Sequence, residues 1–215
     1  HAALPRVARR SRHKRRACVV FTLIFFSRAC YKRMAEWGLA LSAAPVGAGI
    51  LISYAMVLMN SFGGFELPTA SSSYIDSPYW LGADRGAIIA IVGFQLLAAA
   101  GYVMWIVWIT LHGGSIENSI LEARIARLLL LHGFLLASLA WPFTAYYYML
   151  SPTTGRAILT SAPLWVAAGC VIVLIGGTFE AGAPWYAVVG ILMLGTVVVL
   201  ADGVGWSAMA IKRSL

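Results

Sequence analysis

The chain has 215 residues, of which 60% are hydrophobic and 11% charged, and its mean hydropathy is +0.81. Soluble domains are about 45–50% apolar and about 25% charged. This composition excludes an ordinary soluble domain. It favours an all-α fold, a polytopic transmembrane helix bundle with about five spanning helices, organised as one domain.

The net charge of +8 comes from the first 33 residues. This segment holds ten of the 16 Lys and Arg and no acidic residue, whereas residues 34–215 carry six basic and eight acidic groups. A basic cluster can bind nucleic acid or an anionic lipid surface. Because this cluster directly precedes a hydrophobic body, we favour a membrane-facing or targeting role and expect no nucleic-acid partner.

Residues 1–33 admit three interpretations. They resemble a signal-like leader with a short apolar run at 17–26, or an Arg-rich organellar presequence, or sequence translated upstream of a true start at Met34. The ten-residue run is too short to span a membrane. A segment of this charge density gains too little from burial to offset the entropy of ordering. We therefore expect residues 1–33 to be disordered and residues 34–215 to form a single transmembrane helical domain.

Five stretches of the body, free of charge apart from Asp202, are each long enough to cross roughly 30 Å of hydrocarbon. They predict spanning helices near 38–59, 86–111, 128–150, 157–179 and 185–208. A 26-residue connection rich in Gly, Ser and Pro, residues 60–85, separates the first two stretches. Connections of that length are usually functional or disordered.

Local patterns refine the helix boundaries and contacts. Ser119 and Glu122 have the spacing of a capping box, which predicts that the third helix starts near Ser119 and enters the membrane after Arg127. Small residues let helix backbones approach closely. We expect Ala43 and Gly47 to form one such close-packing face, and Gly86 and Ala90 another. Gly169, Gly190 and Gly195 are expected to have the same role.

Catalytic motifs are absent from the sequence. It contains no P-loop, no zinc-peptidase motif and no serine-hydrolase elbow. None of the three lysines falls in a predicted span, which excludes a retinal-type Schiff base. Cys18, Cys30 and Cys170 lack the spacing of a zinc site or a disulfide framework. The motifs therefore indicate neither a cofactor nor a metal.

His112 and His132 are the ligand candidates, because they are the only histidines beyond residue 33 and lie toward the same predicted side of the membrane. Two facing imidazoles could hold a haem or a metal ion. Such sites normally also need further ligands and outer partners. The two histidines lie at different predicted depths, so we prefer ordinary hydrogen-bonding roles for both.

Asp202 is the one acidic residue that can lie within the membrane, where ionisable groups are costly and usually functional. With Gln95 and Arg156, the latter on the same predicted side, it forms the set of transport candidates. Asp202 follows Trp185 by 17 residues. We therefore expect it near the far interface, where an aspartate needs no special role.

Three classes of function remain. Nearly charge-free spans and small-residue faces favour a non-catalytic subunit or scaffold, embedded in a lipid bilayer and packed against partner membrane proteins or further copies of itself. A small oligomeric channel or transporter, proton-coupled through Asp202, is the first alternative. The second is a lipid-modifying or haem enzyme at the membrane interface that uses His112 and His132. The membrane stays open, as does the orientation, because the Lys and Arg balance between the two sides reverses when residues 1–33 are left out.

The five predicted spans place residues 70 and 118 on opposite sides of the membrane. We expect a membrane-impermeant thiol reagent to label only one of Ala70→Cys and Asn118→Cys in sealed vesicles, in a variant whose native cysteines are replaced by serine. The other position should react only after permeabilisation. Labelling of both positions from one side would contradict this topology.

Overall fold

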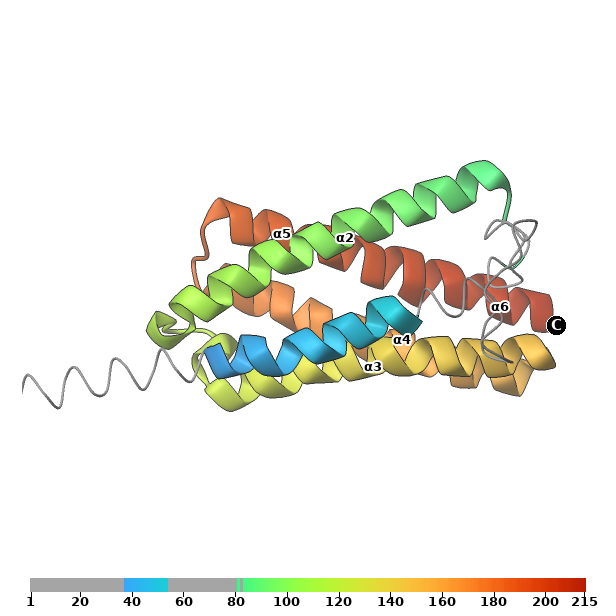
Figure 1. Ribbon diagram of the computed structural model, residues 1–215, viewed down its shortest axis with the longest axis horizontal. Coiled ribbons are helices and arrows are strands. Elements are labelled where there is room, and N and C mark those ends of the chain that lie inside the picture. The colour runs from blue at the N-terminus through green and yellow to red at the C-terminus, as the bar shows by residue number, and fades with distance from the viewer. Residues whose placement is uncertain (1–36, 54–80, 82) are drawn as a thin grey trace, which may run out of the picture.

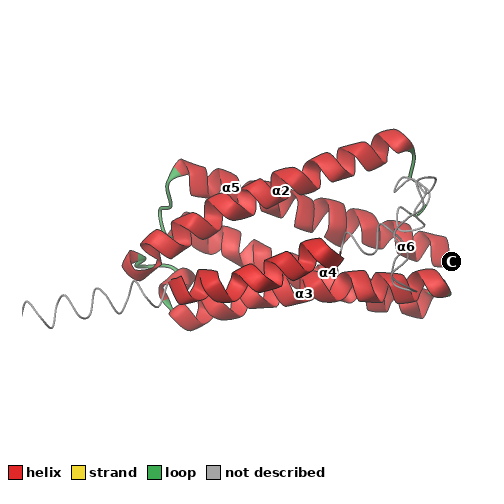
Figure 2. Cartoon of the chain, viewed as in Figure 1, coloured by secondary structure: helices red, strands yellow, loops and turns green. Residues whose placement is uncertain are grey.

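The computed structural model describes residues 37–53, 81 and 83–215. Within these ranges every regular element is a helix, and the long helices lie along the long axis of an elongated bundle (Figure 1). Short loops connect α2 to α3, α3 to α4 and α4 to α5 (Figure 2). The predicted all-α bundle is confirmed.

Four helices are long and apolar enough to cross a membrane. The first three are α2 (Arg85–His112), α3 (Arg124–Leu150) and α4 (Thr154–Glu180). The fourth is a continuous C-terminal helix that comprises α5 (Trp185–Gly195), the π-helical segment η6 (Thr196–Trp206) and α6 (Ser207–Ser214). They correspond to the second to fifth predicted spans, although the last helix runs six residues beyond its predicted end at 208.

The first predicted span is only partly described. An apolar helix covers Trp37–Ser53, which is 17 residues. At 1.5 Å per residue it rises about 25 Å, less than the roughly 30 Å of a bilayer core. Residues 1–33, the end of the predicted span at 54–59 and almost all of the 60–85 connection lie outside the described residues.

Capping residues set several of the helix ends. The Asp84 carboxylate accepts a hydrogen bond from the Ala87 N–H at 2.9 Å, which satisfies one of the free donors at the start of α2. The Thr153 hydroxyl accepts one from the Arg156 N–H at 3.4 Å at the start of α4. Gly182, with φ of +60°, provides the left-handed turn that ends α4.

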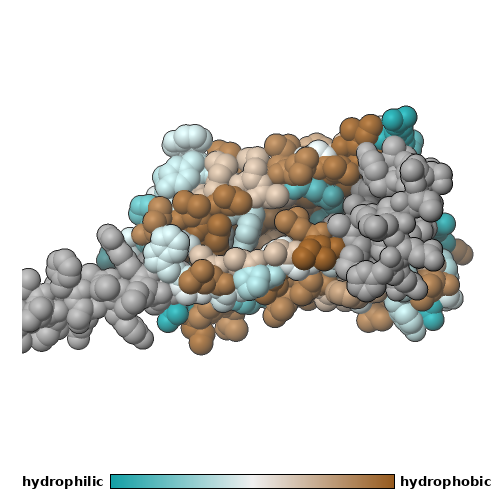
Figure 3. Space-filling view, viewed as in Figure 1, coloured by the Kyte–Doolittle hydropathy of each residue, from teal (hydrophilic) through white to brown (hydrophobic). Residues whose placement is uncertain are grey.

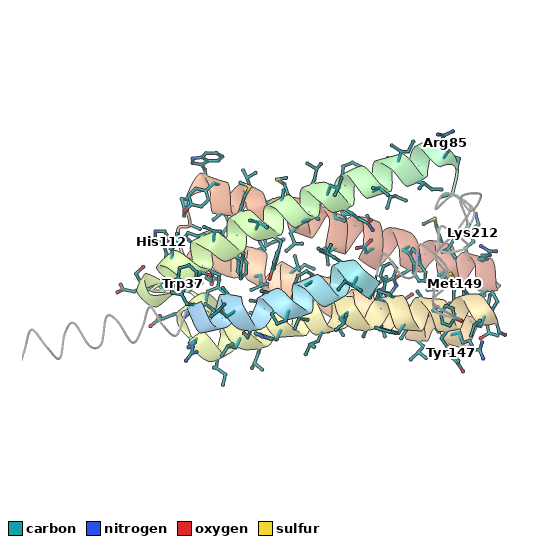
Figure 4. All side chains as sticks on the ribbon, in the orientation of Figure 1. Trp37, Arg85, His112, Tyr147, Met149 and Lys212 are labelled. Atoms are coloured by element: carbon teal, nitrogen blue, oxygen red, sulfur yellow. The ribbon has the colours of Figure 1, made fainter. Side chains whose placement is uncertain are left out.

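Neighbouring long helices run in alternating directions, so the bundle has two distinct ends. Trp37 and His112 lie at one end, and Arg85 and Lys212 lie at the other (Figure 4). We call these the His112 end and the Arg85 end. The α3–α4 turn, which contains Ser151, lies at the Arg85 end.

Aromatic residues form the buried core near the Arg85 end. Trp141 and Trp206 meet edge to face with ring centroids 5.3 Å apart, and Tyr148 packs on Trp206 at 6.1 Å. The buried Tyr148 hydroxyl donates a hydrogen bond to the Ala210 carbonyl at 2.9 Å. These contacts join α3 to the C-terminal helix without leaving the Tyr148 hydroxyl unsatisfied.

The α2 and α5 backbones cross in direct contact at two glycines. A Cβ added at Gly190 would lie 2.7 Å from the Gly101 carbonyl oxygen, and one added at Gly101 would collide with the Gly190 carbonyl. The expected close packing at Gly190 is confirmed, and its partner Gly101 was missed. Gly195 also packs closely, because an added Cβ would lie 2.6 Å from Ile175.

The other small-residue contacts are not made within the described chain. Ala43 is buried, but an added Cβ at Gly47 or Gly169 meets nothing within 4 Å among the described residues. Gly86 and Ala90 are exposed. Gly169 is exposed as well, so Gly86, Ala90 and Gly169 point out of the bundle, whereas Ala43 belongs to the buried core.

The predicted start of the third helix is also corrected. Ser119 caps the short 3₁₀ turn η5 (Ile120–Glu122) by accepting a hydrogen bond from the Leu121 N–H at 3.1 Å, and α3 begins only at Arg124. The buried Arg127 side chain reaches back and donates to the Leu121 and Glu122 carbonyls. Those carbonyls are therefore held outside the α-helix, and no capping box forms.

The contact between Gly101 and Gly190 gives a direct test of the helix crossing. In an exposed helix, Gly→Ala stabilises by up to about 1 kcal/mol. We expect Gly93→Ala, which meets nothing within 4 Å on the same helix, to be neutral or stabilising. Gly101→Ala should destabilise by about 1–3 kcal/mol through overpacking, measured by thermal unfolding in detergent. Equal midpoints for the two variants would contradict the crossing.

Candidate functional site

Asp202 lies in the π-helical segment η6, which spans 11 residues. π-Helices pair residue i with i+5, are rare, and occur frequently at functional sites. Residues four or five positions apart therefore share one side of η6. On the side of Asp202 these residues are Val197, Val198 and Trp206, all buried. The carboxylate accordingly faces the interior of the bundle.

A hydrogen bond to the next residue fixes the depth of Asp202. The Trp165 indole N–H donates to the Gly203 carbonyl at 3.1 Å. Trp165 lies nine residues from Arg156 and 15 from Glu180 on α4, or about 13 Å and 22 Å along the helix. Asp202 therefore lies within the length of the bundle, because the C-terminal helix continues for 12 residues beyond it to Ser214. Its expected place near the far membrane interface stays a prediction.

The structure does not bring Arg156 to Asp202. The Arg156 guanidinium stacks 4.1 Å from the Tyr147 ring centroid and donates to the backbone carbonyls of Tyr147 and Ser151 at 3.4 and 3.3 Å. Arg156 thus serves the α3–α4 turn at the Arg85 end. Within the described part of the chain, the carboxylate of the partly buried Asp202 makes no hydrogen bond and no ion pair.

Ser207 is the residue near Asp202 that the sequence did not reveal. It is 3% exposed, and its hydroxyl has no hydrogen-bond partner in the described structure. It follows Asp202 by five residues, so the π-helical repeat brings it toward the same side. An α-helical repeat of 3.6 residues does not relate the two positions, which is why sequence periodicity missed it.

Gln95 approaches from α2, which packs against both α5 and η6. It is partly buried on the inward stripe of α2, between the buried Ile88 and Ala98, and makes no hydrogen bond within the described residues. On the face shown in Figure 3, hydrophilic side chains lie in a hollow between α2 and the helix Trp37–Ser53. We call Gln95, Asp202 and Ser207 the interior polar site.

Most other polar side chains of the spans are satisfied locally. Their hydroxyls donate to carbonyls three or four residues earlier on the same helix, in the pairs Thr144 to Trp141, Ser161 to Ala157 and Thr196 to Leu192. The Thr160 hydroxyl is shared between the Arg156 carbonyl on its own helix and the Thr144 carbonyl on α3, each at 2.8 Å. Such groups are scattered singly and stabilise individual helices. They do not extend the interior polar site.

The two histidines each bond to their own helix. Nδ1 of His112 lies 3.2 Å from the Trp108 carbonyl, and Nδ1 of His132 lies 3.0 Å from the Leu128 carbonyl. Among the described residues, no group of three or more His, Cys, Asp and Glu gathers in a way that could hold a metal ion. The described part of the chain therefore supplies neither histidine with further protein ligands.

Residues 113–123 close the His112 end of the bundle, and we call them the end cap. The Ser119 hydroxyl donates to the Gly177 carbonyl at 2.7 Å, and the Ile120 N–H donates to a Glu180 carboxylate oxygen at 3.3 Å. Leu121 is fully buried. An added Cβ at Gly177 would lie 2.7 Å from both Ile120 and Leu121, so the cap rests directly on the α4 backbone.

No protein-family model matches the chain, and searches of curated proteins and of solved structures found no significant match. The class of the protein therefore rests on its own structure. That structure is a helical bundle with four helices long and apolar enough to cross a membrane, as a membrane-embedded protein requires.

Two adjacent glycines on α4 allow the end cap to be tested. We expect Gly177→Ala to push the cap off α4 and to speed amide hydrogen exchange in residues 113–123 by about tenfold, since loops open locally when their contacts are lost. Gly176→Ala is the matched control, because an added Cβ there meets nothing within 4 Å. Unchanged exchange in Gly177→Ala would show that the cap does not depend on this contact.

Proposed function

We propose that the protein is a multi-pass integral membrane protein and serves as a non-catalytic subunit that packs through α2 against a partner membrane protein. The low burial of α2 carries this proposal. In its most apolar stretch 17% of the residues are buried, compared with 39% in α3, 33% in α4 and 44% in the C-terminal helix. Apart from its contact with the C-terminal helix, α2 therefore has most of its surface available to a neighbour.

The exposed residues of α2 support a protein neighbour. Gly86, Gly93 and Ala100 are exposed and recur every seven residues, and the exposed Ala90 lies between the first two. Helices associate in lipid mainly through close packing, and small residues at the contact allow it. A seven-residue repeat of small residues suits a long helix that crosses at a shallow angle.

A small oligomeric transporter is the second candidate, favoured by one observation. Asp202 faces the bundle interior about 13 Å from the level of Arg156, and ionisable groups at such depth mark ion or proton paths. On this candidate, Asp202→Asn should abolish proton-coupled flux in reconstituted vesicles while the protein stays monodisperse. Unchanged flux would remove the candidate. The enzyme alternative through His112 and His132 has no comparable support.

Cross-linking in native membranes tests the subunit proposal. We expect Gly93→Cys, in a variant whose native cysteines are replaced by serine, to give a discrete adduct with a membrane-permeant bifunctional thiol reagent or an amine–thiol reagent. Twice the chain mass would identify a second copy, and another discrete mass a different subunit. Gly169→Cys on α4, equally open within the described chain, is the control and should give no discrete adduct.

Two results would contradict the proposal. One is the absence of an adduct from position 93 in membranes in which reagent labelling proves the cysteine accessible. The other is an equal adduct pattern from positions 93 and 169, because that pattern would reflect random collision. Gly93→Leu should in addition reduce co-purification of the cross-linked partner and leave the thermal midpoint within a few degrees.

A further inference from the structure

We propose that the interior polar site binds a small monovalent cation, held by the Asp202 carboxylate and the Ser207 hydroxyl, with Gln95 available from the neighbouring helix α2. This goes beyond the subunit function, which needs no ligand. It extends the transport candidate by naming the class of ligand. The two proposals have Asp202 in common and are otherwise independent. Binding at the site requires no flux.

The charge of the site selects the ligand. A single carboxylate on the buried side of η6 carries one negative charge into an apolar interior, where an isolated ion is strongly disfavoured. The described basic groups of the Arg85 end, Arg85, Lys212 and Arg213, lie at helix termini, and Arg156 is engaged with Tyr147. One monovalent cation neutralises the site, whereas a divalent ion would leave an uncompensated positive charge.

Each residue of the site offers at least one oxygen, the ligand atom that hard cations prefer. The carboxylate offers two oxygens, and a serine hydroxyl has two acceptor lone pairs. The Ser207 hydroxyl is the independent observation that points to a ligand, because it is 97% buried and has no partner in the described structure. A buried hydroxyl without a partner has lost its hydrogen bonds to water and formed none in the protein, which costs free energy unless a bound ligand supplies the missing interaction.

The local backbone holds these groups in place. The hydrogen bond from Trp165 to the Gly203 carbonyl fastens η6 to α4 next to Asp202. An added Cβ at Gly203 would lie 3.3 Å from Ala168, so the two helices are closely packed there. Asp202 nevertheless keeps part of its surface exposed.

Thermal unfolding of the full chain in mild detergent tests the inference, with NaCl exchanged for choline chloride at constant ionic strength and pH 8. A ligand that binds only the folded state raises the midpoint in a saturable way. We expect Na⁺ to do so for the native protein and for the control Glu117→Gln, an exposed residue of the end cap. Asp202→Asn should lose the response, and Ser207→Ala should weaken the apparent affinity by about tenfold, or about 1.4 kcal/mol.

Three results would overturn the inference. The first is the same midpoint in NaCl and choline chloride across the full concentration range, and the second is a full Na⁺ response in Asp202→Asn. The third is a midpoint that depends on pH through Asp202 but never on Na⁺, which would indicate a proton-only site. If Asp202→Asn does not fold, equilibrium binding of radioactive Na⁺ to the native protein and to Ser207→Ala decides the matter.

The same preparation separates the site from the transport candidate. Na⁺-dependent stabilisation without flux in vesicles would refute transport and retain the binding site. Flux that persists while Na⁺ has no effect on the midpoint would refute the cation site and retain transport.

Discussion

The structure depends on one constraint, which is that polar groups inside an apolar bundle must find partners within the protein. Long uninterrupted helices satisfy the backbone, and the hydroxyls of residues such as Ser161 and Thr196 return to carbonyls of their own helix. The few longer polar side chains bridge helices. Trp105 donates to Thr178 at 2.9 Å, and Tyr148 donates to Ala210. Against this background, an interior polar group that has no partner stands out.

Helices in lipid gain little hydrophobic energy from associating, so they depend on close packing. The bundle achieves it where side chains are smallest, at Gly101 against Gly190 and at Gly195 against Ile175. Gly177 has the same role for the end cap, since it lets Leu121 and its neighbours rest on the α4 backbone. Other glycines face outward and make no such contact within the bundle. On α2, these outward-facing glycines lie on the surface that we assign to a partner.

Within the described residues, the interior polar site departs from this internal pairing, because Asp202, Gln95 and the buried Ser207 hydroxyl make no hydrogen bond. It coincides with the only π-helical segment in the described chain, where the wider turn aligns residues five apart. Asp202 and Ser207 are thereby brought to one side of a helix in which all nearby residues on that side are buried. A subunit function would leave this arrangement unused, whereas a bound ion or a transported one would use both residues. The outward face of α2 and the interior polar site can therefore serve different tasks in one protein.

The sequence by itself determined the class of fold, because a run of about 20 apolar residues has one stable form in lipid. The four long helices follow from the lengths of their apolar runs alone, and the predicted ends lie within about six residues of the observed ones.

Tertiary structure decided the features that no local sequence pattern encodes. It moved the start of α3 to Arg124, because Arg127 draws the η5 carbonyls out of the helix. It also paired Gly101 with Gly190 and placed Asp202 on the inward side of a π-helical segment. Helix formation depends on neighbours within five residues, whereas depth and pairing depend on contacts between segments far apart in the chain.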